Sequence, residues 1–271
     1  MGKRVTINDL AVGGEGVGRL EDGRAVFVVG SAVGDELLID LTEEKKRYAR
    51  GRIVEVLSPG ENRRDPPCPN VVKGCGGCDW QHLNQDAQID AKLSIVAQSL
   101  ERLGSISPPD IGYVSGPEEK NYRTTMRVGV VDGHAALRKA RSNELIQLEE
   151  CVVAHPMIED ILANGFFHTA SDVTIRVGSR TGDRLVMGEP VADGFSLPDD
   201  VRVVGRNEAR KGAEAFVFEE AAGIEWRISA QSFFQSSPEG AESLIGLTAE
   251  WLSVQDVGEQ VMVDLYAGVG L

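Results

Sequence analysis

The first sixty residues alternate apolar and polar positions in short bursts, and glycine-rich breaks separate the bursts. Strands that bury one face show this alternation because successive side chains point to opposite sides of a sheet. The bursts lie at 5–7, 17–20, 25–29, 37–41 and 53–57. Such short strands, with turn signals between them, predict a small β-barrel of the oligonucleotide-binding type over residues 1–59.

A helix is predicted after the barrel. Residues 59–69 form a proline-rich, charged linker, and the next regular element begins near Asn84. From there apolar residues recur at helical spacing, namely Ile89, Leu93, Val96, Leu100 and Leu103. Asn84 is a suitable N-cap and Gly104 follows the last apolar residue, so we predict an amphipathic helix between them.

The middle of the chain is predicted to be mostly sheet with one short helix. Asp132 and Gly133 form a favoured two-residue turn between apolar runs, which predicts a β-hairpin within 122–150. A helix is predicted over 155–164, with Pro156 in its first turn. Further strands are predicted at 173–177, 201–204, 216–218 and 224–228.

The pattern changes again near the end of the chain. Residues 238–252 predict a helix and the apolar run 261–265 predicts a strand. We therefore predict an α+β chain with three domains. They are an OB-like β-barrel at 1–59, a central mixed α/β domain at 60–228, and the beginning of a Rossmann-like domain at 229–271.

Composition and charge limit the function classes. The apolar content of 42% suffices for ordinary cores, whereas the net charge of -14 argues against a uniformly basic protein that coats nucleic acid. RNA binding would have to be local. The densest basic run is Lys45, Lys46, Arg47, Arg50 and Arg52, of which the first three are the candidate RNA contacts. Two interpretations of the run stay open, an RNA contact or a solvated hairpin face.

The four cysteines have a spacing typical of metal ligands. The chain has no run of eighteen apolar residues, and its start lacks the apolar stretch of a secretory signal, so we expect a cytoplasmic protein. In that reducing compartment, clustered thiols serve as metal ligands or catalytic groups. Cys68, Cys75 and Cys78 follow C-x6-C-x2-C in a glycine-rich loop, and Cys151 lies far along the chain. Three-plus-one spacing favours an iron-sulfur cluster. Structural zinc, which usually takes two close pairs of cysteines, stays open as the alternative.

A glycine motif closes the sequence. Asp264, Gly268 and Gly270 form D-x-x-x-G-x-G after the apolar run at 261–265. Glycines at the end of a strand let a nucleoside-bearing cofactor lie against the backbone. The alternative is a tight turn after a buried strand.

Four segments, in this order, resemble the RNA uridine-C5-methyltransferases. They are CPNVVKGCGGCDWQHL, YRTTMRVGVVDGHAALRKARSNELIQLEEC, ISAQSFFQSSP and VMVDLYAGVGL. The predicted barrel also resembles the TRAM domain that many members of this family carry. The resemblance therefore runs over essentially the whole chain, and its cysteine segment is the most specific part.

The resemblance implies roles for individual residues. The ligands of a [4Fe-4S] cluster would be Cys68, Cys75, Cys78 and Cys151. The contacts of S-adenosyl-L-methionine would be Gln235, Tyr266, Gly268 and Gly270. Contacts to RNA phosphates in the central sheet would be Arg123, Arg127, Arg138 and Lys139, for which a solvated strand face is the alternative.

The sequence departs from the family pattern at two places. Many members have an asparagine two residues after Gln235, where this chain has Ser237. In the family, the catalytic cysteine, a general-base glutamate and the rest of the cofactor pocket lie beyond the position of Leu271. We therefore expect a truncated chain that is inactive alone, with no catalytic residue of its own.

The family chemistry explains this expectation. Uracil C5 attacks the sulfonium methyl group only after a thiolate has added to C6, and a base then removes the C5 proton. All four cysteines are assigned to the cluster, so no thiol remains for this step. We expect a monomer that binds RNA and no membrane, with 23S ribosomal or transfer RNA as substrate.

Two other functions stay open as alternatives. A radical methylthiotransferase also combines a TRAM domain with a cluster, but it uses a C-x3-C-x2-C triplet that this chain lacks. A non-catalytic RNA-binding module would use the barrel and the cluster domain without methyl transfer.

Overall fold

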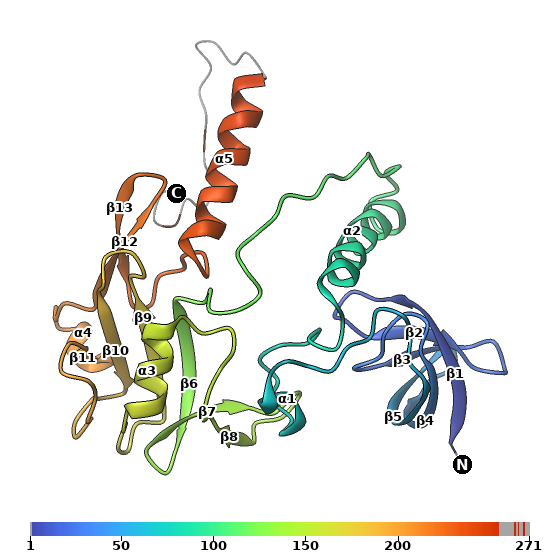
Figure 1. Ribbon diagram of the computed structural model, residues 1–271, viewed down its shortest axis with the longest axis horizontal. Coiled ribbons are helices and arrows are strands. Elements are labelled where there is room, and N and C mark those ends of the chain that lie inside the picture. Colours follow the sequence, from blue (N-terminus) through green and yellow to red (C-terminus); the bar gives the residue numbers. More distant parts are fainter. Residues whose placement is uncertain (1, 255–262, 264, 266–267, 269–271) are drawn as a thin grey trace. The chain divides into compact units, whose positions relative to one another are not determined.

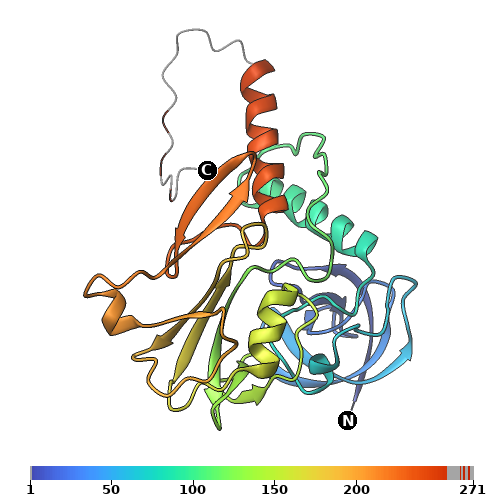
Figure 2. The same ribbon diagram turned by 60° about the vertical axis from the view of Figure 1, so that its left-hand side comes forward.

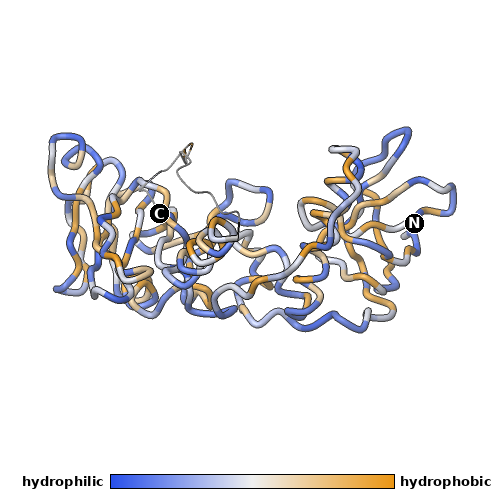
Figure 3. The backbone as a smooth tube through the Cα atoms, turned by 90° about the horizontal axis from the view of Figure 1, so that it is seen from above, coloured by the Kyte–Doolittle hydropathy of each residue, from blue (hydrophilic) through white to orange (hydrophobic). Residues whose placement is uncertain are grey.

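The chain folds into two compact units. The structure is a computed structural model that describes residues 2–254 together with Val263, Leu265 and Gly268 (Figure 1). The first unit comprises Met1–Val71 with Cys78–Tyr113, and the second comprises Val72–Gly77 with Val114–Leu271. Hydrophobic and hydrophilic stretches alternate in short runs along the backbone (Figure 3).

The first unit contains the predicted barrel. Its strands are β1 (Lys3–Leu10), β2 (Gly16–Arg19), β3 (Ala25–Val28), β4 (Glu36–Glu44) and β5 (Tyr48–Ser58). They pair in the order β1-β2-β3-β5-β4, and β4 pairs with β1 again to close the barrel. Alternate residues such as Ile7, Val26 and Ile39 are fully buried inside. The closed barrel predicted from the alternation is confirmed.

A buried carboxylate ties the end of the barrel to the following loop. The Asp35 side chain is 0% exposed and accepts hydrogen bonds from the amides of Ala32 at 2.7 Å and Gly60 at 2.9 Å. The Arg63 guanidinium donates to both Asp35 oxygens, at 2.9 and 2.6 Å. Burial by itself raises the pKa of Asp35, but these donors, Arg63 above all, outweigh it and lower the pKa overall.

Helix α2 (Gln85–Arg102) belongs to the barrel unit. The Asn84 side chain accepts from the Ala87 amide at 2.9 Å and caps the helix, as predicted. Ala91 and the preceding Leu83 are buried in one cluster with barrel residues Leu10 and Ala32. The contacts thus group this helix with the barrel, whereas the sequence placed it in a central domain that begins at residue 60. The three-domain division stays a prediction.

The second unit is built on a six-stranded sheet. Its strands are β6 (Thr125–Val131), β7 (His134–Arg138), β8 (Leu145–Gln147), β9 (Asp172–Val177), β10 (Arg184–Glu189) and β11 (Arg202–Gly205). They pair in the order β11-β10-β9-β6-β7-β8. The predicted hairpin is β6–β7, and its turn residues Asp132 and Gly133 have φ angles of 51° and 79°.

The remaining elements of this unit include three helices and one hairpin. Helix α3 is Pro156–Asn164, α4 is Arg206–Ala209 and α5 is Pro238–Val254. The short α1 (Pro69–Val72) lies in the cysteine loop, and all but its last residue belong to the first unit. The hairpin is formed by β12 (Phe216–Ala221) and β13 (Ile224–Ser229), and it contacts the base of α5 (Figure 2). None of the helices in the described part of the chain is long and apolar enough to cross a membrane.

The sheet has two different faces. Arg184 of β10 donates to the Met157 carbonyl of α3, so Arg184 and its register partner Val177 face that helix. Arg176, the neighbour of Val177, therefore lies on the opposite face. There Leu185 and other residues of β10 pack beneath the β12–β13 hairpin, which covers only part of this face. The part over β6, β7 and β9 carries exposed polar side chains.

The buried Asp35 generates a stability prediction for the barrel. We expect Asp35→Asn to lower the free energy of unfolding of the first unit by about 3 kcal/mol, because it leaves the Arg63 charge without its buried partner. The measurement is urea unfolding followed by the fluorescence of Trp80, with Trp226 and Trp251 replaced by phenylalanine.

The matched control is Asp40→Asn. Asp40 pairs with Arg52 on the barrel surface at 2.8 Å, with side chains 41% and 69% exposed. We expect this control to change stability by less than about 0.5 kcal/mol. Equal effects of the two substitutions would contradict the role given to Asp35.

Candidate functional site

Residues 232–237, between β13 and α5, are held at every second position. The Ser232 carbonyl accepts from Arg176 Nη2 at 2.7 Å. Phe234 is 6% exposed and packs in the cluster beneath the hairpin. The Ser236 carbonyl accepts from the Thr124 amide at 2.9 Å. This segment is therefore fixed to the sheet along its length.

The residues between these anchors remain accessible. Phe233 is 76% exposed and Gln235 is partly exposed. Gln235, one of the predicted cofactor contacts, thus lies on a fixed backbone just before α5. Gly268 lies in a turn with φ 63°, whereas Tyr266 and Gly270 lie outside the described residues. The predicted cofactor site therefore stays a prediction.

Ser237, which stands where many family members have asparagine, caps α5. Its side chain is almost fully buried, and its hydroxyl accepts from the Gly240 amide at 3.0 Å. The hydroxyl is thus used by the helix terminus, as expected for serine at an N-cap position.

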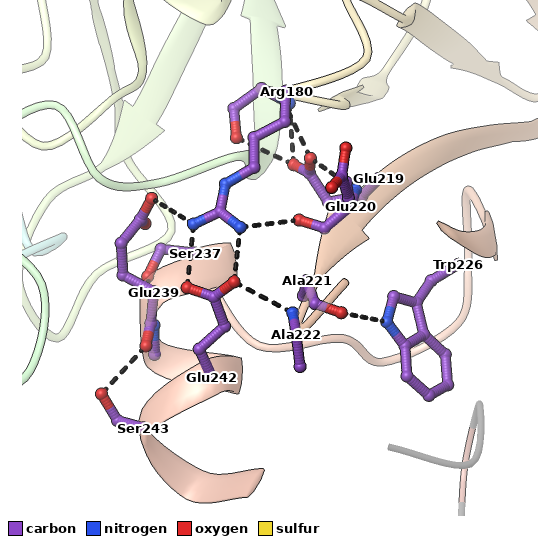
Figure 4. Close-up of polar contacts among 12 residues, drawn as sticks. Arg180, Glu219, Glu220, Ala221, Ala222, Trp226, Ser237, Glu239, Glu242 and Ser243 are labelled. Carbon is purple, nitrogen blue, oxygen red and sulfur yellow. Dashed lines mark hydrogen bonds and ion pairs between the residues drawn. The ribbon is translucent and has the colours of Figure 1, made fainter. Parts of the chain in front are cut away.

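An ion-pair network fixes the start of α5 to the sheet (Figure 4). Arg180, in the β9–β10 connection, donates Nη1 and Nη2 to the two carboxylate oxygens of Glu242 at 2.5 and 2.9 Å. Nη2 also donates to Glu239 at 3.3 Å, and Nη1 to the Glu220 carbonyl at 3.2 Å. Glu242 in turn accepts from the amide of Ala222, in the hairpin turn, at 2.9 Å.

The connection that carries Arg180 is itself held by a buried carboxylate. Glu219 is 1% exposed. It accepts from the Ser179 amide at 2.7 Å, the Ser179 hydroxyl at 2.9 Å and the Arg180 amide at 3.1 Å. The sequence does not predict this network, because Arg180, Glu219 and Glu242 are far apart along the chain and no local pattern links them.

Arg176 is a buried cation beside the anchored segment. It is 5% exposed, and within the described residues its Nε has no hydrogen-bond partner. Burial lowers the pKa of Arg176 to about 10, so the guanidinium keeps its charge at neutral pH. Its Nη2 donates to the Ser232 carbonyl, which makes Arg176 an anchor of the segment that carries Gln235.

The predicted RNA-binding residues are not all brought together. Arg127 and Arg138 share the open part of the sheet, with side chains 59% and 55% exposed. Arg123 is partly buried, and its amide bonds the Val153 carbonyl. Lys139 pairs with Glu144.

The basic run of the barrel lies in the first unit. Lys45, Lys46 and Arg47 form the turn between β4 and β5, where the Lys45 amide donates to the Tyr48 carbonyl at 2.8 Å. Lys45 also pairs with Glu43 at 3.1 Å. All three are exposed, so both interpretations of this run, RNA contact and solvated hairpin, stay open.

The four cysteines lie in different surroundings. Cys68 is buried in the first unit, and its amide donates to the Gln81 side chain at 3.1 Å. Cys78 is also in the first unit and is partly exposed. In the second unit, Cys75 forms an isolated bridge with Lys139, and the amide of the buried Cys151 donates to Glu159 at 2.7 Å.

The glycines of the cysteine loop have a clear structural role. A Cβ at Gly76 would lie 2.7 Å from Ala140 Cα, and Gly74 has φ 89°, so both positions favour glycine. The thiol donors suit a soft metal site by type and number. Among the described residues, however, no three side chains of metal-binding type gather as a ligand set. The cluster therefore stays a prediction.

Comparisons with known proteins match the chain over most of its length. The TRAM domain model matches residues 3–54. A relative from Streptomyces avermitilis, named an uncharacterized RNA methyltransferase, is 32% identical over 98% of this chain and 67% of its own length. Another of that name, from Thermosynechococcus vestitus, is 29% identical over 97% of this chain and 68% of its own length. The chain thus spans about two thirds of the length of these relatives.

A solved structure shares the fold. The tRNA (uracil-54, C5)-methyltransferase of Pyrococcus abyssi, in complex with S-adenosyl-L-homocysteine, superposes with a TM-score of 0.65. The match covers 98% of this chain and 68% of that one at 19% sequence identity, which shows a common fold.

The Arg180 network generates a prediction on pH. The hydrogen bonds from Arg180 and the Ala222 amide lower the pKa of Glu242 to about 2, from an ordinary 4.5. A carboxyl whose pKa falls on folding stabilises above its unfolded pKa and loses that contribution as the pH falls through its folded pKa. Because both side chains are about one third exposed, solvent screening reduces the contribution to about 1 kcal/mol.

We therefore expect Glu242→Gln to lower the free energy of unfolding of the second unit by about 1 kcal/mol at pH 7. The difference from the original protein should shrink between pH 4.5 and pH 2, where both states protonate. The measurement is urea unfolding followed by Trp226 fluorescence, with Trp80 and Trp251 replaced by phenylalanine. Glu239→Gln, which removes the longer contact, is the control with a smaller effect. A difference that does not change with pH would contradict the assignment.

Proposed function

Because this chain belongs to the RNA methyltransferase family of the Streptomyces avermitilis relative, we propose that the protein methylates C5 of a uridine in structured RNA. The observation that carries the proposal is the anchored 232–237 segment, which presents Gln235 beside the start of α5 in a chain of this family. The fold shared with a tRNA uracil-C5 enzyme supports the choice of C5 over other methylation sites.

The proposed methyl donor is S-adenosylmethionine, which supplies an electrophilic methyl group on a sulfonium. Its proposed contacts are Gln235, Tyr266, Gly268 and Gly270. The structure with S-adenosyl-L-homocysteine supports this donor, because that compound is what remains of S-adenosylmethionine after methyl transfer. The contribution of Gln235 is positional. The carbonyls of Ser232 and Ser236, in the same segment, are bonded to Arg176 and Thr124. The Gln235 side chain is therefore held in position before the cofactor binds, and no loop has to become ordered.

The proposed RNA contacts are local on an acidic chain. Arg127 and Arg138 lie exposed on the sheet, and the TRAM barrel carries Lys45, Lys46 and Arg47 in one turn. Arginine and lysine bind phosphates without regard to sequence, so this binding should weaken as the salt concentration rises. We assign Arg123 and Lys139 to the same RNA.

The proposed metal group is a [4Fe-4S] cluster on Cys68, Cys75, Cys78 and Cys151. The soft thiol donors, which suit such a cluster by type and number, and the glycines around Cys75 support it. Four thiolates saturate a cubane cluster, so its role would be structural. This assignment leaves no cysteine of these 271 residues for the nucleophile, and we expect them alone to transfer no methyl group.

The function is tested in cells, with the protein as its gene encodes it. We expect a strain that lacks the gene to lose 5-methyluridine from one RNA class, because 5-methyluridine is the product of uridine methylation at C5. Ribosomal and transfer RNA are purified separately and digested, and their nucleosides are measured by mass spectrometry.

Restoring the gene should restore 5-methyluridine, and restoring it with Gln235→Ala should do so only in part. The RNA class that loses the nucleoside identifies the substrate. If 5-methyluridine persisted in both classes while another methylated nucleoside disappeared, the family would stand and the C5 assignment would be wrong.

The cluster has its own test. We expect protein purified without oxygen to be brown and to contain about four irons per chain. Cys151→Ser should reduce the iron content as strongly as Cys75→Ser, since each removes one ligand. Iron and zinc are measured by mass spectrometry of the same samples, with Ser142→Ala as a neutral control. Zinc at one equivalent without iron would favour the structural zinc alternative.

A further inference from the structure

Five charged side chains form an alternating row across the open part of the sheet. Arg138 of β7 lies 3.9 Å from Asp172 of β9, and Arg127 of β6 lies 4.0 Å from the same carboxylate. Arg127 also lies 3.5 Å from Glu189 of β10, which pairs in turn with Arg206 of α4. The row thus runs Arg138, Asp172, Arg127, Glu189, Arg206. Three arginines and two carboxylates leave it one positive charge.

The arginines and the carboxylates of this row differ in exposure. The Arg127 and Arg138 side chains are 59% and 55% exposed, whereas Asp172 and Glu189 are 19% and 23% exposed. The guanidinium groups are therefore accessible from solution, and the carboxylates lie deeper between them. Polyanions that approach this face meet the arginines first.

The two carboxylates are fixed by the sheet. Asp172 and Glu189 are direct register partners of β9 and β10, and cross-strand partners have adjacent side chains. The Glu189 carbonyl also accepts from the Ser171 amide at 3.1 Å. Like charges placed opposite each other destabilise a sheet, so the surrounding arginines must offset them. This arrangement costs stability and adds negative charge to a face that is proposed to bind RNA.

The contacts from Arg127 and Arg138 to these carboxylates are long. Distances of 3.5 to 4.0 Å exceed the 2.7 to 2.9 Å of strong charge-assisted hydrogen bonds. Within the described residues, these two arginines are attracted by the carboxylates but make no short hydrogen bond to them. A phosphate could bind them at short distance only while it stands close to the negative charges of Asp172 and Glu189.

We propose that Asp172 and Glu189 are specificity-determining residues, which lower the affinity of Arg127 and Arg138 for RNA phosphates. This inference rests on the proposed function. The repulsion applies to every RNA, because every RNA has phosphates. An RNA without structure, held by phosphates alone, is then bound weakly. A folded substrate, which gains further contacts through its shape, stays bound. The two carboxylates thereby increase the difference in affinity between the folded substrate RNA and an unstructured RNA.

The test compares Asp172→Asn and Glu189→Gln with the original protein. We expect each substitution to increase the affinity for a single-stranded oligouridine about three-fold at roughly 0.1 M salt. This is the effect of removing one unit charge roughly 8 Å from a phosphate at an effective dielectric constant of about 30. The affinity for folded RNA, taken from the class identified in the cell experiment, should rise less. Kd values are measured by fluorescence anisotropy at several salt concentrations.

The matched control is Asp199→Asn. It removes the same charge from an exposed position in the β10–β11 connection, beside Asp200, which pairs with Arg184. Arg184 faces α3, so Asp199 lies away from the row. We expect this control to leave both affinities unchanged. Urea unfolding checks the fold, and if one variant of the row is unstable the other still carries the test.

The outcomes separate the two proposals. Unchanged oligouridine binding in both variants would overturn the role of the carboxylates. Weaker binding would overturn it as well, since it would mean that Asp172 and Glu189 hold the arginines in place for RNA. If the original protein bound neither RNA, the failure would lie with the proposed RNA contacts of the sheet.

Discussion

The partial covering of one sheet face determines where the candidate site lies. The face opposite α3 buries Leu185 and Met187 under the β12–β13 hairpin, while Asp172 and Thr174 on the neighbouring strand lie beyond it. Apolar side chains on β10 require this cover, since their exposure would cost the free energy gained by burial. The anchored 232–237 segment continues directly from the hairpin. The position of this segment, and of Gln235 within it, is therefore set by the edge of the β12–β13 hairpin.

Buried charges hold these pieces in place by hydrogen bonds to backbone groups. Glu219 accepts from the amides of Ser179 and Arg180, and Arg176 donates to the Ser232 carbonyl. A buried ion without partners would cost several kcal/mol, so each of these side chains restricts the backbone to conformations that satisfy it. The β9–β10 connection and the 232–237 segment are thus specified by single side chains.

Elements with a local signal could be predicted from the sequence, and contacts between distant residues could not. Asn84 was recognisable as a cap, and Asp132 and Gly133 as a turn, because both depend on neighbouring residues alone. Strand β10 has no alternating pattern that would predict it, because it is buried on both faces at Leu185, Val186 and Met187. The candidate cofactor residues came from resemblance. The Arg180 network and the charged row arise from register and chain reversal, which sequence spacing does not encode.

The acidic character of the chain is consistent with RNA as a partner once its charges are considered locally. A net charge of -14 repels a polyanion at distances up to about one Debye length, roughly 10 Å at 0.1 M salt. Within that distance the field is set by neighbouring side chains, and the row that contains Arg127 and Arg138 keeps a small positive excess. A strongly basic face would bind any RNA tightly, whereas a nearly balanced one lets shape decide which RNA stays. Mixed charge on a binding face therefore favours selection over affinity.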